Sequence, residues 1–166
     1  MNRLAVFILS ATLFLTACGF QPLYGSHNAS RAGAEDTLAQ IDIANIPDRE
    51  GQYLRNALID RFYRHGRPSD PLYTLQISPV RETLTDLDIT KSSDATRGQL
   101  RLSTHMTRIE RASGEAVLNR DLTSITSYNI LGSEFSTRVS EENTRLNALN
   151  DLARQIELQA SLYLHR

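Results

Sequence analysis

The chain has 166 residues, of which 18 are Lys or Arg and 19 are Asp or Glu, so its formal charge is −1 at pH 7. This near balance excludes the strongly basic surface typical of nucleic-acid-binding proteins and the acidic tail that attracts a basic partner. The single cysteine, Cys18, excludes a disulfide within the chain.

The first 17 residues have the layout of a secretory signal peptide that is cleaved. Arg3 supplies a positive start, residues 4–15 form an apolar segment, and small or short residues precede Cys18. The apolar segment is shorter than the roughly 20 residues that span a bilayer. Two alternatives stay open: an ordinary signal peptide in which Cys18 occurs by chance, and a short membrane anchor.

Cys18 is the predicted site of lipid attachment. The residues Leu15-Thr16-Ala17-Cys18 resemble the bacterial lipobox, in which the cysteine is lipidated and becomes the first residue of the mature chain. Several acyl chains anchor a protein stably, since each buried methylene contributes about 0.8 kcal/mol. Gly19 stands where, in enteric-type lipoproteins, an aspartate favours inner-membrane retention. We therefore expect a palmitate-bearing lipoprotein of the outer membrane whose domain initially faces the periplasm.

Residues 18–37 are predicted to form the lipidated N-terminus and a flexible tether, and residues 38–166 a single domain. From Gly25 onward the tether is rich in Gly, Ala, Ser and Asn and has no apolar periodicity. The segment after it is long enough to bury a core of its own.

The domain begins with a predicted strand and a predicted helix. Residues 38–46 alternate apolar and polar side chains, as in a strand, and Pro47 ends the pattern. Asp48 is placed to cap the helix that follows. Apolar residues then recur at helical spacing as far as His65-Gly66, which predicts about four helical turns. Three further side chains make the flank of this helix apolar as well: Tyr53, Ile59 and Tyr63.

The second predicted strand is interrupted. Residues 73–77 alternate apolar and polar side chains, but Pro79 follows, and a proline inside a sheet is tolerated only at an edge or a bulge. We expect the strand to resume through residues 87–89 after a bulge. Residues 91–98 are polar and are interpreted as a hairpin loop.

Two further strands and a long helix complete the predicted elements. Residues 100–106 alternate regularly, a turn is expected at residues 113–115, and residues 116–128 form a strand whose change of parity indicates a bulge. From about Ser133 the chain is helical. Its apolar stripe consists of Leu146, Leu149, Ala153, Ile156, Ala160 and Tyr163.

The order β-α-β-β-β-α predicts an α+β fold: a two-layer sandwich of a mostly antiparallel four-stranded sheet with two helices. Short turns join the last three strands, so these strands pair antiparallel, and both helices can cover one face of the sheet. The other face carries a mixed set of side chains that includes Arg101, His105 and Thr107. That face is either solvated or a surface for a partner.

No pattern in the sequence predicts catalysis, a cofactor or a metal site. The four histidines lack metal-ligand spacing, and the sequence contains no P-loop, no dinucleotide-binding glycine motif and no nucleophile elbow. The carboxylates do not single out an acid–base pair. We therefore expect a protein that is not an enzyme and that binds no nucleic acid.

One basic cluster is a candidate binding site. Arg81, Lys91, Arg97, Arg101 and Arg108 fall in the middle hairpin and its loop, and if they converge they form a phosphate-binding patch. The alternative is an ordinary charged hairpin surface, because acidic residues are interleaved with the basic ones. Lys91 is the only lysine of the chain, and a GC-rich genome would also produce this preference for arginine.

Three stretches of the chain resemble a known family. They are residues 18–25 (Cys-Gly-Phe-Gln-Pro-Leu-Tyr-Gly), Ala95-Thr96-Arg97, and Ser127-Tyr128-Asn129 followed by Ser133 and Phe135. The chain is similar in these stretches, and over essentially its whole mature length, to the lipopolysaccharide-assembly lipoprotein LptE family in its alphaproteobacterial form.

The resemblance implies a specific role. LptE-like lipoproteins are α/β sandwiches that plug the outer-membrane β-barrel LptD as heterodimers, help it assemble and support lipopolysaccharide transport to the cell surface. Lys91, Arg97, Arg101 and Arg108 would then be contacts for lipopolysaccharide phosphates. An alternative function is a lipid-anchored adaptor subunit of another envelope transporter. Neither the affinity for lipopolysaccharide nor the barrel-contacting residues follow from the sequence.

Overall fold

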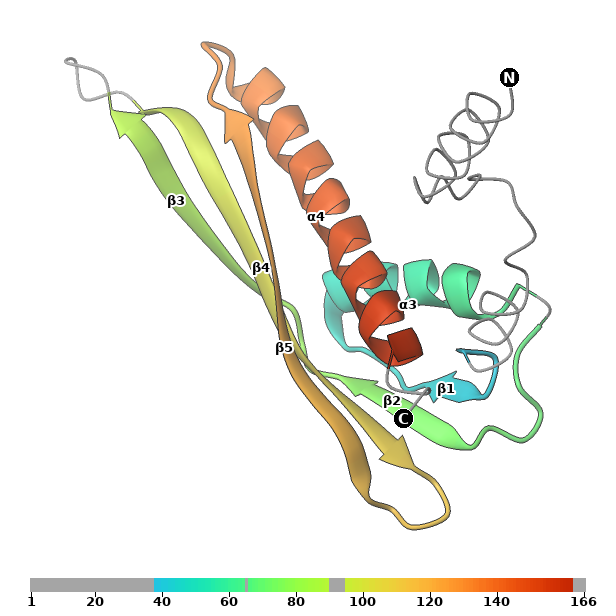
Figure 1. Cartoon of the computed structure of the whole chain (residues 1–166). Coiled ribbons are helices and arrows are strands. Elements are labelled where there is room, and N and C mark those ends of the chain that lie inside the picture. The colour runs from blue at the N-terminus through green and yellow to red at the C-terminus, as the bar shows by residue number, and fades with distance from the viewer. Residues whose placement is uncertain (1–37, 65, 90–94, 163–166) are drawn as a thin grey trace, which may run out of the picture. The chain divides into compact units, whose positions relative to one another are not determined.

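The computed structural model describes residues 38–64, 66–89 and 95–162 (Figure 1). Within them it has the predicted α+β fold, a sheet with helices packed on one of its faces. The elements in chain order are β1 (Ile41–Ile43), α3 (Asp48–Phe62), β2 (Tyr73–Ile77), β3 (Arg81–Ile89), β4 (Ala95–Glu110), β5 (Ala116–Asn129) and α4 (Glu134–Leu162).

The sheet is built around β4, its longest strand. One side of β4 pairs antiparallel with β5 along almost its whole length. The other side pairs antiparallel with two strands in succession, β3 at the first half of β4 and β2 at the second half. β1 adds to β2 in parallel. Among the described elements β5 pairs only with β4, so β5 forms one edge of the sheet.

The sheet has five strands where the sequence predicted four. The predicted second strand is interrupted at residues 78–80, so that β2 and β3 are separate strands that share β4 as partner. The predicted hairpin loop is shorter than expected, since β4 begins at Ala95, which pairs with Ile89. β1 is also shorter than its alternating pattern, although Leu38 before it and Ile46 after it are both buried.

The turn and the bulge between β4 and β5 are where the sequence predicted them. Gly114 has a φ of 71°, a conformation that glycine adopts at little cost, and its N–H donates to the carbonyl of Glu110 at 2.8 Å. The register of the two strands shifts between Arg108 and Ile109, opposite Leu118 and Ala116. One extra residue on β5 produces the change of parity seen in the sequence.

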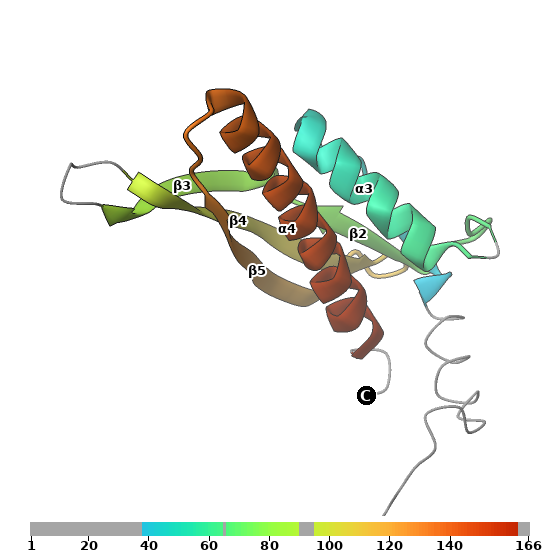
Figure 2. The ribbon, with the colours of Figure 1, turned by 90° about the horizontal axis from the view of Figure 1, so that it is seen from above.

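Both helices lie on the same face of the sheet, as Figure 2 shows from above. α4 packs along β5 and also contacts β4, while α3 packs against α4 and β1. The buried core between the layers is apolar, because the inward residues of β2, β4 and β5 meet the predicted stripe of α4. Its largest fully buried side chains are Ile41, Ile43, Ile46, Leu54, Leu58, Leu75, Leu100, Leu102, Met106, Leu149, Leu152 and Ile156.

Gly51 lets the start of α3 pack closely on the segment before it. A Cβ at this position would lie 2.7 Å from Cγ2 of Ile46, closer than side-chain atoms approach in proteins. Gly51 is buried, and its missing side chain leaves room for Ile46 in the core. Pro47 precedes the helix and Asp48, its first residue, has a φ of 67°.

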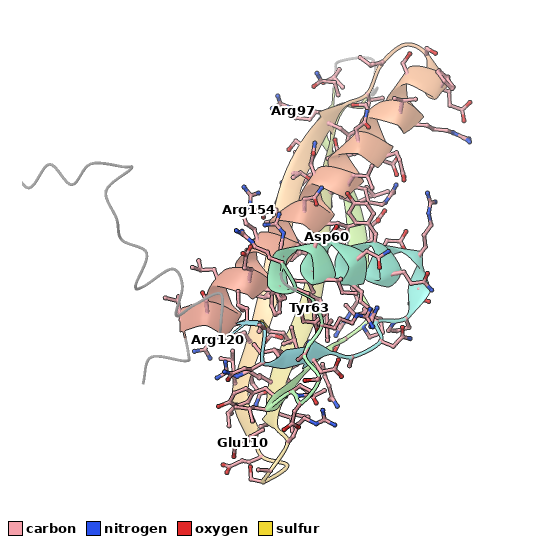
Figure 3. All side chains as sticks on the ribbon, turned by 90° about the vertical axis from the view of Figure 1, so that its right-hand side faces the viewer. Asp60, Tyr63, Arg97, Glu110, Arg120 and Arg154 are labelled. Atoms are coloured by element: carbon pink, nitrogen blue, oxygen red, sulfur yellow. The ribbon has the colours of Figure 1, made fainter. Side chains whose placement is uncertain are left out.

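Tyr63 fastens the end of α3 to β1. Its hydroxyl donates to the carbonyl of Ile41 at 2.8 Å and accepts from the N–H of Ile43 at 3.0 Å. Figure 3 shows Tyr63 between the helix and that strand. Burial is the main cause that raises the pKa of the Tyr63 hydroxyl above its usual value of about 10. A three-residue strand is too short to hold its place by ladder bonds alone, so this hydroxyl is part of what positions β1.

Replacing Tyr63 with phenylalanine is expected to lower the free energy of unfolding by about 1–3 kcal/mol, because two part-buried backbone groups lose their hydrogen-bond partner.

The stability of the domain should also depend on alkaline pH, because burial raises the pKa of Tyr128 as well as that of Tyr63. Above pH 10 the unfolded chain releases these phenolic protons while the folded chain retains them, so stability is full below pH 10 and falls as the pH rises further. Urea unfolding of wild type and Tyr63→Phe between about pH 8 and 11 should show a shallower alkaline loss in the variant. An equal loss of stability with rising pH in wild type and variant would contradict this account.

Candidate interaction surfaces

The sheet face opposite the helices is left open by the two layers (Figure 2). Residues directly opposed in an antiparallel pair share a face, so the registers place the odd-numbered residues of β3 and β4, with their β5 partners, on this open face. It is rich in hydroxyl and amide side chains and has few charges. Its uncharged polar members include Thr83, Thr85, Gln99, Ser103, Thr107, Asn119, Thr123 and Ser127.

Three arginines of the predicted basic cluster meet on the open face. Arg97 and Arg101 are exposed on β4, and Arg81 on β3 lies opposite Ser103, diagonal to Arg101. Figure 3 labels Arg97 near one end of β4 and Glu110 at the other end. The register places Arg101 and Arg81 further along the strands, toward the middle of the sheet, so the three arginines form a row on this face. An exposed row of guanidinium groups suits planar anions such as phosphate or carboxylate.

Arg108 does not join the other arginines, because its side chain lies on the helix-covered face. It is only 2% exposed, and its Nη1 donates to the carbonyl of Ala160 near the end of α4 at 3.2 Å. Its guanidinium carbon stands 4.8 Å from the ring centre of Tyr73. A cation at a helix C-terminus interacts favourably with the partial negative charge there. The role this geometry gives Arg108 is to hold α4 on the sheet.

Cys18 and Lys91, the other predicted site residues, lie outside the described residues. The predicted phosphate-binding patch is therefore represented in the structure by Arg81, Arg97 and Arg101.

A cross-strand polar ladder that the sequence did not reveal continues along the open face. His105 Nδ1 lies 2.8 Å from Oδ1 of Asp121, and one rung further the hydroxyl of Thr107 donates to the amide oxygen of Asn119 at 2.9 Å. These partners are recognisable only once the register of β4 and β5, including its bulge, is known. The ladder leaves the middle of the face polar and nearly neutral.

A second exposed surface is apolar and lies at the start of α4. Leu131, Phe135 and Val139 are 48%, 77% and 45% exposed. Figure 1 shows that this end of α4 and the free end of β3 and β4 lie at the same end of the domain. The C-terminal half of the same helix buries its apolar stripe in the core, whereas these side chains at its start have no such cover. They are therefore a candidate contact for a partner.

The apolar flank predicted for the first helix is mostly used inside the domain. Ile59 and Tyr63 pack against the buried core. Tyr53 is 36% exposed, and its hydroxyl accepts a hydrogen bond from the side-chain amide of Asn150 at 3.1 Å. The flank of α3 therefore joins the two helices and offers little free apolar surface.

No group of three or more His, Cys, Asp or Glu residues within 38–64, 66–89 and 95–162 is arranged to hold a metal ion. Over the same ranges, no helix combines the length and the apolar character that a membrane crossing requires.

Comparison with known structures identifies the fold. It is an α+β sandwich found in bacterial lipoproteins. A putative lipoprotein from Caulobacter crescentus CB15 aligns with a TM-score of 0.61 and 23% identity, over 81% of this chain and 97% of that one. A minor lipoprotein from Acinetobacter baumannii aligns with a TM-score of 0.61 and 22% identity over 75% and 92% of the two chains. The rare lipoprotein B of Shewanella oneidensis aligns at 0.57 and 10% identity, over 75% and 92%.

No protein-family model and no curated protein sequence matches the chain. At the identities of these structural neighbours the likeness concerns the fold. It shows the fold that these lipoproteins share and does not distinguish an alphaproteobacterial form.

Proposed function

We propose that this chain is a lipid-anchored, non-enzymatic lipoprotein of the outer membrane that plugs the LptD β-barrel, helps it assemble and supports lipopolysaccharide transport. The observation that carries the proposal is the combination of a lipobox-like sequence ending at Cys18 with a downstream domain that has the fold of bacterial lipoproteins. The three-stretch resemblance to the LptE family supplies the particular barrel and cargo.

The open face of the sheet supports docking inside a barrel. The interior of an outer-membrane barrel is polar, so the surface of a plug that faces this interior is polar as well. The hydroxyl and amide side chains of this face, with His105 paired to Asp121, have that character. A surface that faces lipid would be apolar instead.

Affinity purification of the full chain from outer membranes tests the proposal. We expect LptD to be recovered with the chain in a stable complex, and a Cys18→Ala variant, which has no thiol to acylate, to lose palmitate labelling and membrane recovery. Recovery from outer membranes without LptD would overturn the plug. Recovery with inner-membrane transport components would favour the adaptor alternative.

The exposed arginines of the open face give a second prediction. Arg97→Glu combined with Arg101→Glu is expected to weaken lipopolysaccharide binding at least about tenfold, since two guanidinium contacts to phosphate are replaced by repulsion. Binding of the purified glycolipid is the measurement. The matched control is Arg111→Glu with Arg138→Glu, two exposed arginines elsewhere. Equal binding by both double variants would remove the arginines from the proposed site.

A further inference from the structure

The two long edges of the sheet differ in how they are protected against strand addition. Exposed edge strands present unpaired N–H and C=O groups, and proteins commonly blunt them with charged side chains, proline or bulges. On β3 the exposed residues Arg81 and Asp86 place charges along the edge. On β5 the residues 122–129, Leu-Thr-Ser-Ile-Thr-Ser-Tyr-Asn, include no charge, no proline and no glycine.

The hydrogen bonds show which residues of β5 present their backbone groups to the free edge. The N–H of Ile130 donates to the carbonyl of Thr96, and the N–H of Ser78 donates to the carbonyl of His105. The backbone groups of even-numbered β4 residues therefore form hydrogen bonds with β5, and those of odd-numbered β4 residues form hydrogen bonds with β2 and β3. The register pairs even residues with even residues, so from Asp121 to Asn129 the odd residues of β5 point outward.

Side chains cover only a small part of this edge. The amide of Gln155 donates to the carbonyl of Thr123 at 3.2 Å, and Arg120 Nη1 donates to the carbonyl of Asn119 at 2.9 Å. A carbonyl oxygen has two lone pairs and accepts a second donor. The edge from Thr123 to Asn129 is thus available for strand pairing in the described domain.

From this asymmetry we infer that β5 pairs with β5 of a second copy of the chain, antiparallel, with a two-fold axis at Ile125. This register sets Ile125 against Ile125, Thr123 against Ser127 and Asp121 against Asn129. An apolar side chain then faces an apolar one, polar side chains face polar ones, and no two charges of the same sign are opposed. Ile125 is 48% exposed on the open face of the single domain, and its symmetry mate covers it. Shifting the axis to Thr123 would set Ile125 against Asp121.

The pairing closes on itself as a dimer. A two-fold interface uses the same patch on both copies, and the charges on the β3 edge keep that edge from extending the sheet further. The wall of a closed barrel offers no strand edge, so this interface is separate from the proposed docking into LptD. It belongs to the chain outside that complex, and its failure would leave the proposed function untouched.

Sedimentation of the purified full chain in mild detergent tests the inference. We expect the mass to rise from one chain to two over about 1–100 µM. Ile125→Lys should raise the dissociation constant at least about tenfold, since two like charges are opposed at the axis. The matched control is Thr83→Lys on β3. Thr83 lies beside Arg101, as Ile125 does, but on the opposite side of β4. This control should change the dissociation constant of the dimer less than about twofold.

Cross-linking provides a readout that reports the register. In a chain carrying Cys18→Ser, an introduced cysteine is the only thiol. Ile125→Cys should then form a disulfide-linked dimer on mild oxidation, because Cα atoms of a hydrogen-bonded antiparallel pair lie about 5.5 Å apart. Thr83→Cys should not. A monomer at all concentrations, equal effects of the two lysines, or equal cross-linking of the two cysteines would each overturn the inference.

Discussion

Replacing Arg145 with glutamine should lower the free energy of unfolding by about 2–3 kcal/mol, the largest effect we expect from a single polar side chain of this domain. Its guanidinium bonds to Glu82 of β3 at 2.8 and 2.9 Å, to Glu141 at 2.6 Å and to Glu142 at 2.5 Å. The Glu82 hydrogen bonds lead the causes that raise its pKa. The side chain is 16% exposed, so its removal leaves three carboxylates close together with limited solvation.

Chemical denaturation of Arg145→Gln and Arg138→Gln measures this contribution against a matched control. Arg138 lies on the same helix and pairs with Glu134, but the two side chains are 76% and 81% exposed. Its replacement should cost less than about 0.5 kcal/mol. Adding Glu82→Gln to Arg145→Gln should recover part of the loss, because one of the crowded carboxylates is removed. Equal costs for the two arginines would show that the Arg145 cluster is no more than a surface ion pair.

Gly98→Ala is the second substitution with a large expected effect, about 1–3 kcal/mol of lost stability. Gly98 lies opposite Tyr128, whose ring covers it, and a Cβ there would be 2.4 Å from Cζ of the ring. The tyrosine supplies the apolar surface that a glycine in a strand lacks. Either the ring must leave its position or β4 and β5 must separate at this end of the sheet.

Thermal or urea unfolding of Gly98→Ala beside Gly132→Ala provides the measurement. Gly132 has no neighbouring atom within 4 Å of an added Cβ, so its change should stay within about 0.5 kcal/mol. Combining Gly98→Ala with Tyr128→Val should cost less than the sum of the two single changes, since the clash disappears with the ring. Additive costs would contradict the close approach.

The sequence was sufficient for the layers and for most element types. Alternation in residues 73–77 and 100–106, the glycine turn at residues 113–115 and the apolar stripe of α4 follow periods of two or 3.6 residues, which are local properties. The interruption at Pro79 was also predicted, because a proline lacks the N–H that a ladder needs. Whether the two halves count as one strand or two depends on how they pair with β4, and no local pattern in the sequence reports strand pairing.

The site predictions were harder because they depend on register and on contacts distant in sequence. Arg101 and Arg108 are seven residues apart, an odd spacing that puts them on opposite faces of one strand. This signal was present, but the predicted strand ended at Met106, before Arg108, whereas β4 continues to Glu110. The contact of Glu82 with Arg145, and of His105 with Asp121, joins different elements and has no counterpart in either local sequence.

The share of the core that α4 supplies makes this helix a condition for the stability of the domain. Six buried side chains of the core come from this helix, namely Ala148, Leu149, Leu152, Ala153, Ile156 and Ala160. A product of premature translation stop, or one clipped by a protease before residue 134, would leave the apolar side of β5 without its cover. Such fragments remain open to degradation. Proteolysis alone should therefore clear copies that lack α4, and the copies that persist are those in which this helix covers the sheet.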